Sequence, residues 1–110
     1  MTRIKLPSKY RAVRTTVCGI TFASKKEAHR YLVLKDRLAK KEIFELRLQP
    51  EFPLTTCGRH IGFYVADFSY RLTKYPGELI VEDVKGVKTA LYRWKKKHML
   101  LEHGITILET

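Results

Sequence analysis

Two strand-like runs of this chain carry acidic residues in otherwise apolar surroundings. They are Val65-Ala66-Asp67-Phe68 and, one hairpin later, Val81-Glu82-Asp83-Val84-Lys85-Gly86. Alternate residues of a strand share a face, so Asp83 and Lys85 project together while the residue between them points away. If the two strands pair as neighbours, Asp67 lies beside Asp83. Two carboxylates and one ammonium group then converge at the end of a sheet, which suits a divalent cation and a phosphate.

A purely structural explanation competes with this one. An exposed aspartate on a strand is usually solvated, and aspartate is disfavoured inside strands. A salt bridge between Asp83 and Lys85 would explain that pair, but it would not explain Asp67 at the same strand end. Charges among apolar residues cost free energy unless they are paired or bind an ion. The arrangement therefore points to an ion-binding or phosphate-binding site, with the salt bridge as the alternative.

Two glutamates have alternative roles. Glu82 is expected on the opposite side of its strand from Asp83, as a surface residue or as a partner of a helix. A β-bulge would instead make Glu82 the ligand in place of Asp83. Glu27 follows Ser24 by three residues, a spacing that predicts an N-terminal capping box. Because Tyr31 lies one turn later on the same helix face, Glu27 can also point toward the acidic site.

Hydrophobic periodicity, caps and turn residues predict an α/β fold with the element order α-β-β-β-α-β and a mixed central sheet flanked by helices. The expected elements are a helix over residues 24–41, strands over 43–49, 60–72 and 78–84, a helix over 89–103 and a strand over 105–108. A short hairpin or extended segment around Cys18-Gly19 precedes them. Residues 15–110 are expected to form one domain, with residues 1–14 as a flexible basic arm.

The net charge of +11, from 22 Lys and Arg against 11 Asp and Glu, predicts a polyanionic partner. Two acid-free basic segments, residues 1–20 and 85–98, flank the region that holds most of the acids. Their candidates for nucleic-acid binding are Arg11, Arg14, Lys88, Arg93, Lys95, Lys96 and Lys97. A solvated helix face is the alternative for any one of them. Phosphate contacts carry no sequence code, so we expect recognition by shape.

The cysteines and apolar runs indicate where the protein works. Cys18 and Cys57 are far apart and lack metal-ligand spacing, which predicts two free thiols in a reduced cytoplasmic compartment. The chain has no signal peptide, and its apolar runs are too short to span a membrane, so no membrane partner is expected.

Four motifs in this order resemble the PD-(D/E)XK nuclease superfamily. They are Ser24-Lys25-Lys26-Glu27-Ala28, Leu48-Gln49-Pro50, Ala66-Asp67-Phe68 and Val81-Glu82-Asp83-Val84-Lys85-Gly86. The chain more closely resembles a family of small phage-encoded endonuclease-like proteins, formerly a domain of unknown function. Its helix glutamate and Gln-Pro step are also similar to the endonuclease subunit of Tn7-type transposases. The resemblance runs from about Lys9 to Leu108 and implies a restriction-endonuclease-like core.

The resemblance implies a catalytic role for five residues. Asp67 matches the Asp of the motif, with Ala66 in place of Pro, and the D/E and Lys positions are filled by Asp83 and Lys85. Glu27 matches the acid of the first helix. Gln49 matches the Gln of the Gln-Pro step and would orient the lysine or a water molecule.

The same resemblance implies a bound metal. Mg²⁺, or Mn²⁺ in its place, would be held by Asp67, Asp83 and the carbonyl of Val84, because hard oxygen ligands suit both ions. Glu27 would bind through water or complete a second site. Lys85 would stabilise the attacking hydroxide or the transition state.

The implied activity is Mg²⁺-dependent endonucleolytic hydrolysis of DNA that leaves a 5′-phosphate and a 3′-hydroxyl. By analogy with other small phage nucleases, we expect branched DNA such as Holliday junctions, in phage recombination or replication and beside other proteins of those processes in the host cytoplasm. One chain has one site, so cutting two strands would require a homodimer. The alternatives are a non-catalytic nucleic-acid-binding module, and a nuclease subunit that acts only with partner proteins or on RNA.

Overall fold

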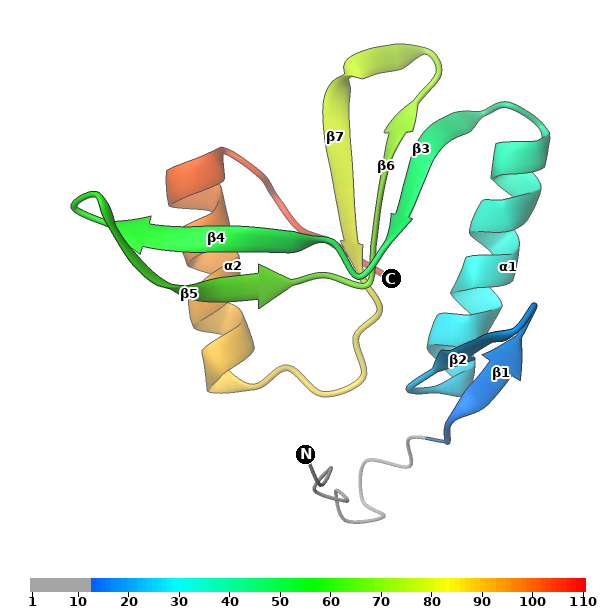
Figure 1. The fold of residues 1–110 in the computed structure, drawn as a ribbon, viewed down its shortest axis with the longest axis horizontal. Coiled ribbons are helices and arrows are strands. Elements are labelled where there is room, and N and C mark those ends of the chain that lie inside the picture. Colours follow the sequence, from blue (N-terminus) through cyan, green and yellow to red (C-terminus); the bar gives the residue numbers. More distant parts are fainter. Residues whose placement is uncertain (1–12) are drawn as a thin grey trace.

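The computed structural model describes residues 13–110, which form two helices and eight strands. In chain order these are β1 (Thr15–Val17), β2 (Ile20–Phe22), α1 (Lys25–Ala39), β3 (Ile43–Leu48), β4 (Glu51–Thr56), β5 (Arg59–Val65), β6 (Phe68–Leu72), β7 (Tyr75–Asp83), α2 (Ala90–His103) and β8 (Leu108–Glu109). Figure 1 shows the strands of the central sheet between the two helices, with β4 and β5 reaching out beside α2. Most of the basic arm predicted over residues 1–14 lies outside the described residues.

The central sheet has four strands in the order β3-β6-β7-β8. The β3–β6 and β6–β7 pairs are antiparallel, whereas β7 and β8 are parallel, so the sheet is mixed. With its helices, this sheet follows the order α1-β3-β6-β7-α2-β8. The prediction of an α/β fold with a mixed sheet and two helices is confirmed.

The prediction of one strand over residues 60–72 is wrong. The segment forms two strands that belong to different sheets, because β5 pairs with β4 in a separate two-stranded ribbon and β6 pairs with β3 and β7. The change occurs at Ala66 and Asp67: the Ala66 N–H still donates to Pro50 O, at 3.1 Å, and the Asp67 N–H already donates to Glu82 O, also at 3.1 Å. Asp67 therefore stands at the point where the chain leaves the ribbon and enters the sheet.

The last strand is also shorter than predicted. Residues 105–107 are not in a strand, and β8 contains only Leu108 and Glu109, which pair with Glu82 and Asp83. Ile107 is buried in the core just before β8, so its apolar character reflects packing and not strand pairing.

Both helices begin and end close to their predicted positions. The Ser24 side chain accepts the Glu27 N–H, so the predicted N-cap of α1 is confirmed, and the Thr89 side chain likewise caps α2 by accepting the Tyr92 N–H. The second helix ends at Gly104, whose φ of 67° is left-handed, a conformation that glycine adopts with little strain. Neither helix within residues 13–110 is long and apolar enough to cross a membrane.

Two hairpins share one turn sequence. Cys18-Gly19 joins β1 to β2, with φ values of 52° and 78°, and Cys57-Gly58 joins β4 to β5, with φ values of 52° and 75°. Positive φ at both central residues is typical of the type I′ turn, whose twist matches that of paired strands. Both cysteines are exposed free thiols.

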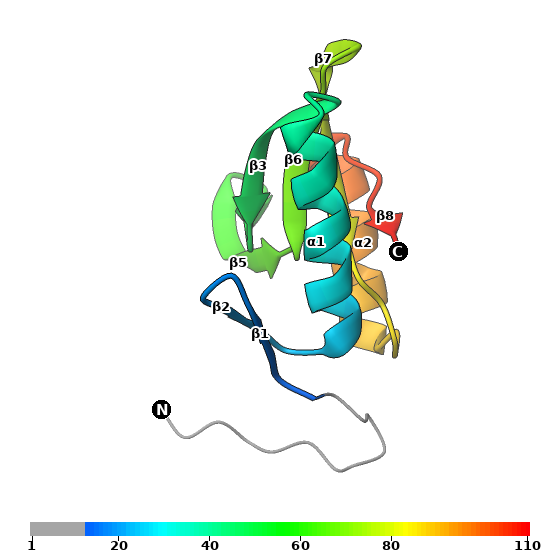
Figure 2. The same cartoon turned by 90° about the vertical axis from the view of Figure 1, so that its right-hand side faces the viewer.

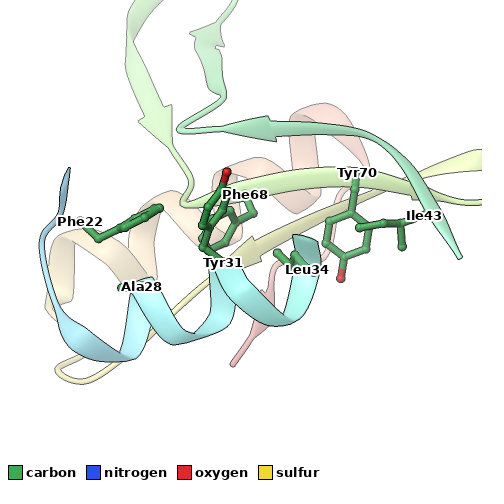
Figure 3. Close-up of a cluster of buried hydrophobic side chains, with 7 residues drawn as sticks. All are labelled: Phe22, Ala28, Tyr31, Leu34, Ile43, Phe68 and Tyr70. Carbon is green, nitrogen blue, oxygen red and sulfur yellow. The ribbon is translucent and has the colours of Figure 1, made fainter. Parts of the chain in front are cut away.

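The two helices cover opposite faces of the sheet. Figure 2 shows α1 in front of the sheet strands and α2 behind them. The cluster under α1 is drawn in Figure 3 and consists of Phe22, Ala28, Tyr31, Leu34, Ile43, Phe68 and Tyr70. The cluster under α2 consists of Leu54, Tyr64, Ala66, Val81, Tyr92, Met99 and Ile107. Because side chains alternate along β6 and β7, neighbouring residues of one strand contact different helices.

Two leucines of α1 provide a test of the core. Leu34 is fully buried beneath the helix, whereas Leu32 is 46% exposed. Leu34→Ala should lower the free energy of unfolding by about 2–5 kcal/mol, because it removes buried methyl groups and leaves a cavity. Leu32→Ala, the matched control in the same helix, should cost less than about 1 kcal/mol. Urea denaturation followed by circular dichroism measures both, and equal costs would contradict the described packing of α1.

Candidate functional site

Glu82 on β7 is fully buried and points toward α1. Its carboxylate accepts two hydrogen bonds of 2.7 Å from the Arg30 guanidinium, one from the Tyr70 hydroxyl and one of 3.2 Å from the Thr110 hydroxyl. Burial raises the pKa of Glu82, but the Arg30 and Tyr70 hydrogen bonds and the Arg30 charge outweigh burial and lower it below its usual value. The predicted role as a helix partner is confirmed, and the alternative role as a surface residue is wrong.

Asp83 points to the opposite face of β7. The β6–β7 register pairs Phe68 with Glu82 without interruption and shifts only between Arg71 and Leu72, so no bulge reverses the strand at Glu82. Because the oxygens of Glu82 are occupied on the α1 side, Asp83 is the carboxylate that the strand presents on the α2 side. The alternative that Glu82 replaces Asp83 as ligand has no support in this geometry.

Asp83 is held by a tyrosine and a lysine. The Tyr64 hydroxyl, on β5, donates to Asp83 Oδ2, and Lys85 Nζ lies 3.2 Å from Asp83 Oδ1. Both Tyr64 and Asp83 are buried. Burial raises the pKa of Tyr64, and its hydrogen bond to Asp83 raises it further, so Tyr64 stays a neutral donor. The salt bridge between Asp83 and Lys85, which was the alternative explanation, is present, but it is part of a larger group.

Asp67 lies beside this group, as expected. Its Oδ2 accepts the Val84 N–H at 2.7 Å, which joins the start of β6 to the end of β7. Burial, then a hydrogen bond to Asp83 and the Asp83 charge, raise the pKa of Asp67 to about 8. Asp67 therefore does not ionise readily at neutral pH beside Asp83.

Glu27 faces the same group from the first turn of α1. Its backbone N–H donates to Ser24, and its side chain is buried. Burial raises the pKa of Glu27, and the Asp83 charge raises it further. Glu27 therefore takes part in the helix cap through its backbone and adds a third carboxyl group near Asp83 through its side chain.

Lys85 is held from three directions. Its ammonium lies 3.7 Å from the ring centroid of Tyr92, on α2, in addition to its contact with Asp83. Its backbone N–H donates to Thr110 O at 3.1 Å, and its carbonyl accepts from Lys26 Nζ at 2.8 Å. The side chain still keeps 19% of its surface exposed, so the ammonium is fixed in position and remains reachable from solvent.

Gln49 supports Asp67 through its backbone. Its N–H donates to Asp67 O at 2.9 Å, and its φ of 50° turns the chain between β3 and β4. The side chain is exposed and makes no hydrogen bond within residues 13–110. The Gln49 side chain therefore does not contact Lys85 in this geometry, and its alternative role of orienting a water molecule stays a prediction.

The predicted nucleic-acid-binding residues fall into three groups. Lys88 and Lys96 lie 3.0 and 3.1 Å from the Glu109 carboxylate, and both are close to Tyr92 around one pocket. Arg14, Arg93 and Lys97 are exposed, and Lys95 is half-buried. Arg11 lies outside the described residues.

The donor set fits a hard divalent cation. Asp67, Asp83 and the Val84 carbonyl offer oxygen atoms, which Mg²⁺ and Mn²⁺ prefer. Burial first, and then the hydrogen bond to Asp83 and the Asp83 charge, raise the pKa of Asp67, and a bound cation would favour its ionised form. Residues 13–110 contain no ready-made cluster of three or more Asp, Glu, His or Cys side chains in metal-ligating positions. The oxygens of Asp67 and Asp83 are instead engaged by Val84, Tyr64 and Lys85.

Three residues of the site escaped sequence analysis. Tyr64 and Tyr92 have the pattern of core aromatics, and both are buried, yet Tyr64 holds Asp83 and Tyr92 contacts Lys85. Arg30 has the pattern of a solvated helix residue, yet it neutralises Glu82. Each of these partners comes from an element distant in sequence, so no local pattern could identify them.

The chain belongs to the family described as protein of unknown function (DUF1064), whose sequence model matches residues 7–104. No curated protein and no solved structure matches the chain.

The carboxyl pair predicts a pH-dependent stability. Since the pKa of Asp67 is about 8 in the folded protein and 3.8 ordinarily, the folded state binds more protons than the unfolded state between these values, and stability falls as pH rises through them. Asp67→Asn keeps an acceptor for Val84 and gains a donor toward Asp83. In EDTA at pH 8.5 it should raise Tm by about 4–8 °C, which corresponds to about 1 kcal/mol, and at pH 4 it should change Tm less. A Tm difference independent of pH would contradict the shared environment of the two aspartates.

The Arg30–Glu82 pair has a matched control on the same helix. Arg30→Met leaves the buried Glu82 carboxylate without its cation and should cost about 3–5 kcal/mol. Arg37→Met removes a 3.4 Å ion pair with the exposed Glu42 and should cost about 0–1 kcal/mol. Guanidinium chloride denaturation measures both. Equal costs would show that Glu82 does not depend on Arg30.

Proposed function

We propose that this protein is a Mg²⁺-dependent endonuclease that hydrolyses phosphodiester bonds of DNA. The observation that carries the proposal is the convergence of Asp67, Asp83 and Lys85 where the start of β6 lies beside the end of β7, with Glu27 near Asp83 on the first turn of α1. A structural salt bridge needs one acid and one base. Asp67 and Glu27 lie near Asp83 in addition to Lys85, and these two further acidic groups exceed that need.

Each residue of the group has a separate task in this proposal. Asp67, Asp83 and the Val84 carbonyl would hold Mg²⁺ or Mn²⁺, and Glu27 would add a ligand through water. Such an ion, when bound, makes a water molecule more acidic and screens the negative charge of the phosphate. Lys85, fixed between Asp83 and the Tyr92 ring, would donate to the attacking hydroxide or to the phosphate oxygens as charge develops. Tyr64 would keep Asp83 oriented.

The proposed core is restriction-endonuclease-like. Its support is the sheet order β3-β6-β7-β8 together with the sequence α1-β3-β6-β7-α2-β8. Asp67 directly precedes β6 and Asp83 is the last residue of β7, which are the places where the PD-(D/E)XK resemblance expects acids. The β4–β5 ribbon is an insertion between β3 and β6 in this view. It supplies Tyr64 to the site.

DNA is the proposed substrate class because of charge and placement. The chain carries +11, and four cations from α2 and the loop before it lie around a pocket that includes Tyr92, the residue beneath Lys85. We propose selectivity for branched DNA in phage recombination or replication, in the host cytoplasm, with two chains needed to cut two strands. Gln49, whose side chain faces solvent, is a candidate for contact with substrate.

A cleavage panel tests the function. Labelled single-stranded, duplex, flap and four-way-junction DNA, together with RNA, are incubated with Mg²⁺ or EDTA and with wild type or Asp83→Asn. We expect Mg²⁺-dependent cleavage that leaves a 5′-phosphate and falls at least 100-fold in the variant.

Three outcomes of the panel would contradict this function. Binding without cleavage, unchanged by the substitution at Asp83, would favour a non-catalytic nucleic-acid-binding module. Cleavage of RNA alone would favour a ribonuclease. Cleavage only after addition of cell extract would favour a nuclease subunit that depends on partner proteins.

The lysine gives a second prediction. Lys85→Met keeps most of the contact with Tyr92 but removes the ammonium, so kcat should fall about 10²–10³-fold with little change in KM. Lys74→Met, at the exposed β6–β7 turn, removes the same charge far from the site and should retain activity. Steady-state cleavage over a range of DNA concentrations gives kcat and KM for both variants. A loss confined to KM would assign Lys85 to binding and not to catalysis.

A further inference from the structure

A pocket of about 390 Å³ lies between α2 and the segment that leads into β8. Its volume is within the range of about 300–1,000 Å³ that is usual for small-ligand sites. Four cationic side chains line it: Lys88, Arg93, Lys96 and Lys97. One carboxylate, Glu109, is the only acid among its lining residues. The pocket is therefore suited to an anion.

The same pocket has an apolar surface that inorganic phosphate would not use. Tyr92, Leu100 and Thr106 line it together with the alkyl stems of the lysines. Leu100 is half exposed. A planar ring could pack against this surface while a phosphate reaches the cationic rim, as aromatic and basic side chains do for unstacked bases.

Glu109 does not cancel the positive charge. Its carboxylate contacts Lys88, Lys96 and the Tyr92 hydroxyl, at 3.0, 3.1 and 2.7 Å. Arg93 and Lys97 are exposed and form no ion pair within residues 13–110. Two cations thus remain available to a ligand, and two more are held in place by Glu109.

Tyr92 connects the pocket to the proposed catalytic group. Its ring lies 3.7 Å from Lys85 Nζ, and its hydroxyl donates to Glu109, which pairs with Asp83 in the β7–β8 register. A ligand in the pocket would therefore contact Tyr92, the residue that also contacts Lys85.

We propose that this pocket binds a single unpaired nucleotide of a DNA strand, with its base against Tyr92 and Leu100 and its phosphate at Arg93 and Lys97. The proposal rests on the proposed function and extends it. A paired nucleotide is stacked within the duplex and cannot enter such a pocket, whereas an unpaired nucleotide costs little to extrude. The pocket gives the protein a means to recognise irregular DNA without reading its sequence.

The first experiment uses deoxyadenosine monophosphate, deoxyribose 5-phosphate and inorganic phosphate as probes, in EDTA, by isothermal titration calorimetry or NMR. The nucleotide should bind at least tenfold more strongly than either of the others. Leu100→Trp fills the pocket and should weaken nucleotide binding at least tenfold. Leu101→Trp, the neighbouring position at 83% exposure and outside the pocket, should leave it unchanged within twofold. Equal binding of all three probes, or equal effects of the two variants, would overturn the proposal.

The second experiment distinguishes a free nucleotide from a nucleotide within a strand. A duplex with one unpaired adenine and a fully paired duplex of equal length are compared by fluorescence anisotropy in EDTA. The unpaired adenine should increase affinity at least fivefold in wild type, and Leu100→Trp should abolish this increase. Lys97→Gln should reduce it, whereas Lys74→Gln, which removes the same charge far from the pocket, should not. An equal preference in wild type and Leu100→Trp would overturn the proposal.

Both experiments measure binding in EDTA, where no metal is present and no cleavage occurs. Their outcome therefore does not depend on whether the protein is a nuclease. Nucleotide binding without any nuclease activity would leave the pocket assigned and reject the nuclease. Cleavage by a protein that shows no preference for unpaired adenine would keep the nuclease and reject the pocket.

Discussion

The buried ion pair of Glu82 with Arg30 sets the direction of the side chains at the end of β7. A strand alternates, so the residue that follows a glutamate directed toward α1 must face α2. Four hydrogen bonds from α1, β6 and the C-terminal residue hold Glu82 in that direction. A slip of one residue would direct the shorter side chain of Asp83 toward Arg30 and bring Glu82 to the site. The pair therefore specifies register, which is the best-attested use of buried charges.

The side chains around Asp83, on the α2 side of β7, come from four parts of the fold. The β4–β5 ribbon brings Tyr64, the ribbon-to-sheet junction brings Asp67, β7 brings Asp83, and α2 brings Tyr92 beneath Lys85. Burial and mutual repulsion raise the pKa of Asp67 and Glu27, so the group is costly to the folded state without a cation. Buried acidic side chains with raised pKa values, which lower the stability of the folded state, are often found at functional sites.

Local patterns were sufficient to predict part of this arrangement. The Ser24 and Thr89 caps depend on neighbouring residues, and the adjacency of Asp67 and Asp83 depends on a single hairpin. The ribbon could not be recognised from the apolar run of residues 60–72, because pairing partners change at Ala66 for tertiary reasons. Its turn was nevertheless visible, since Cys57-Gly58 repeats the Cys18-Gly19 turn sequence. The tyrosine hydroxyls and the exposed side chain of Gln49 depend on long-range packing, which no local pattern encodes.

Titration of the purified protein with Mn²⁺ by isothermal titration calorimetry tests the central claim most directly. The account predicts saturable binding that releases a proton at pH 7, because Asp67, with a pKa of about 8, is largely protonated without a cation. Asp83→Asn should weaken this binding at least tenfold, whereas Glu78→Gln, an exposed position at the other end of β7, should not. Mn²⁺ binding that is equal in wild type and Asp83→Asn would contradict the account, and the acids at the end of β7 would then be purely structural.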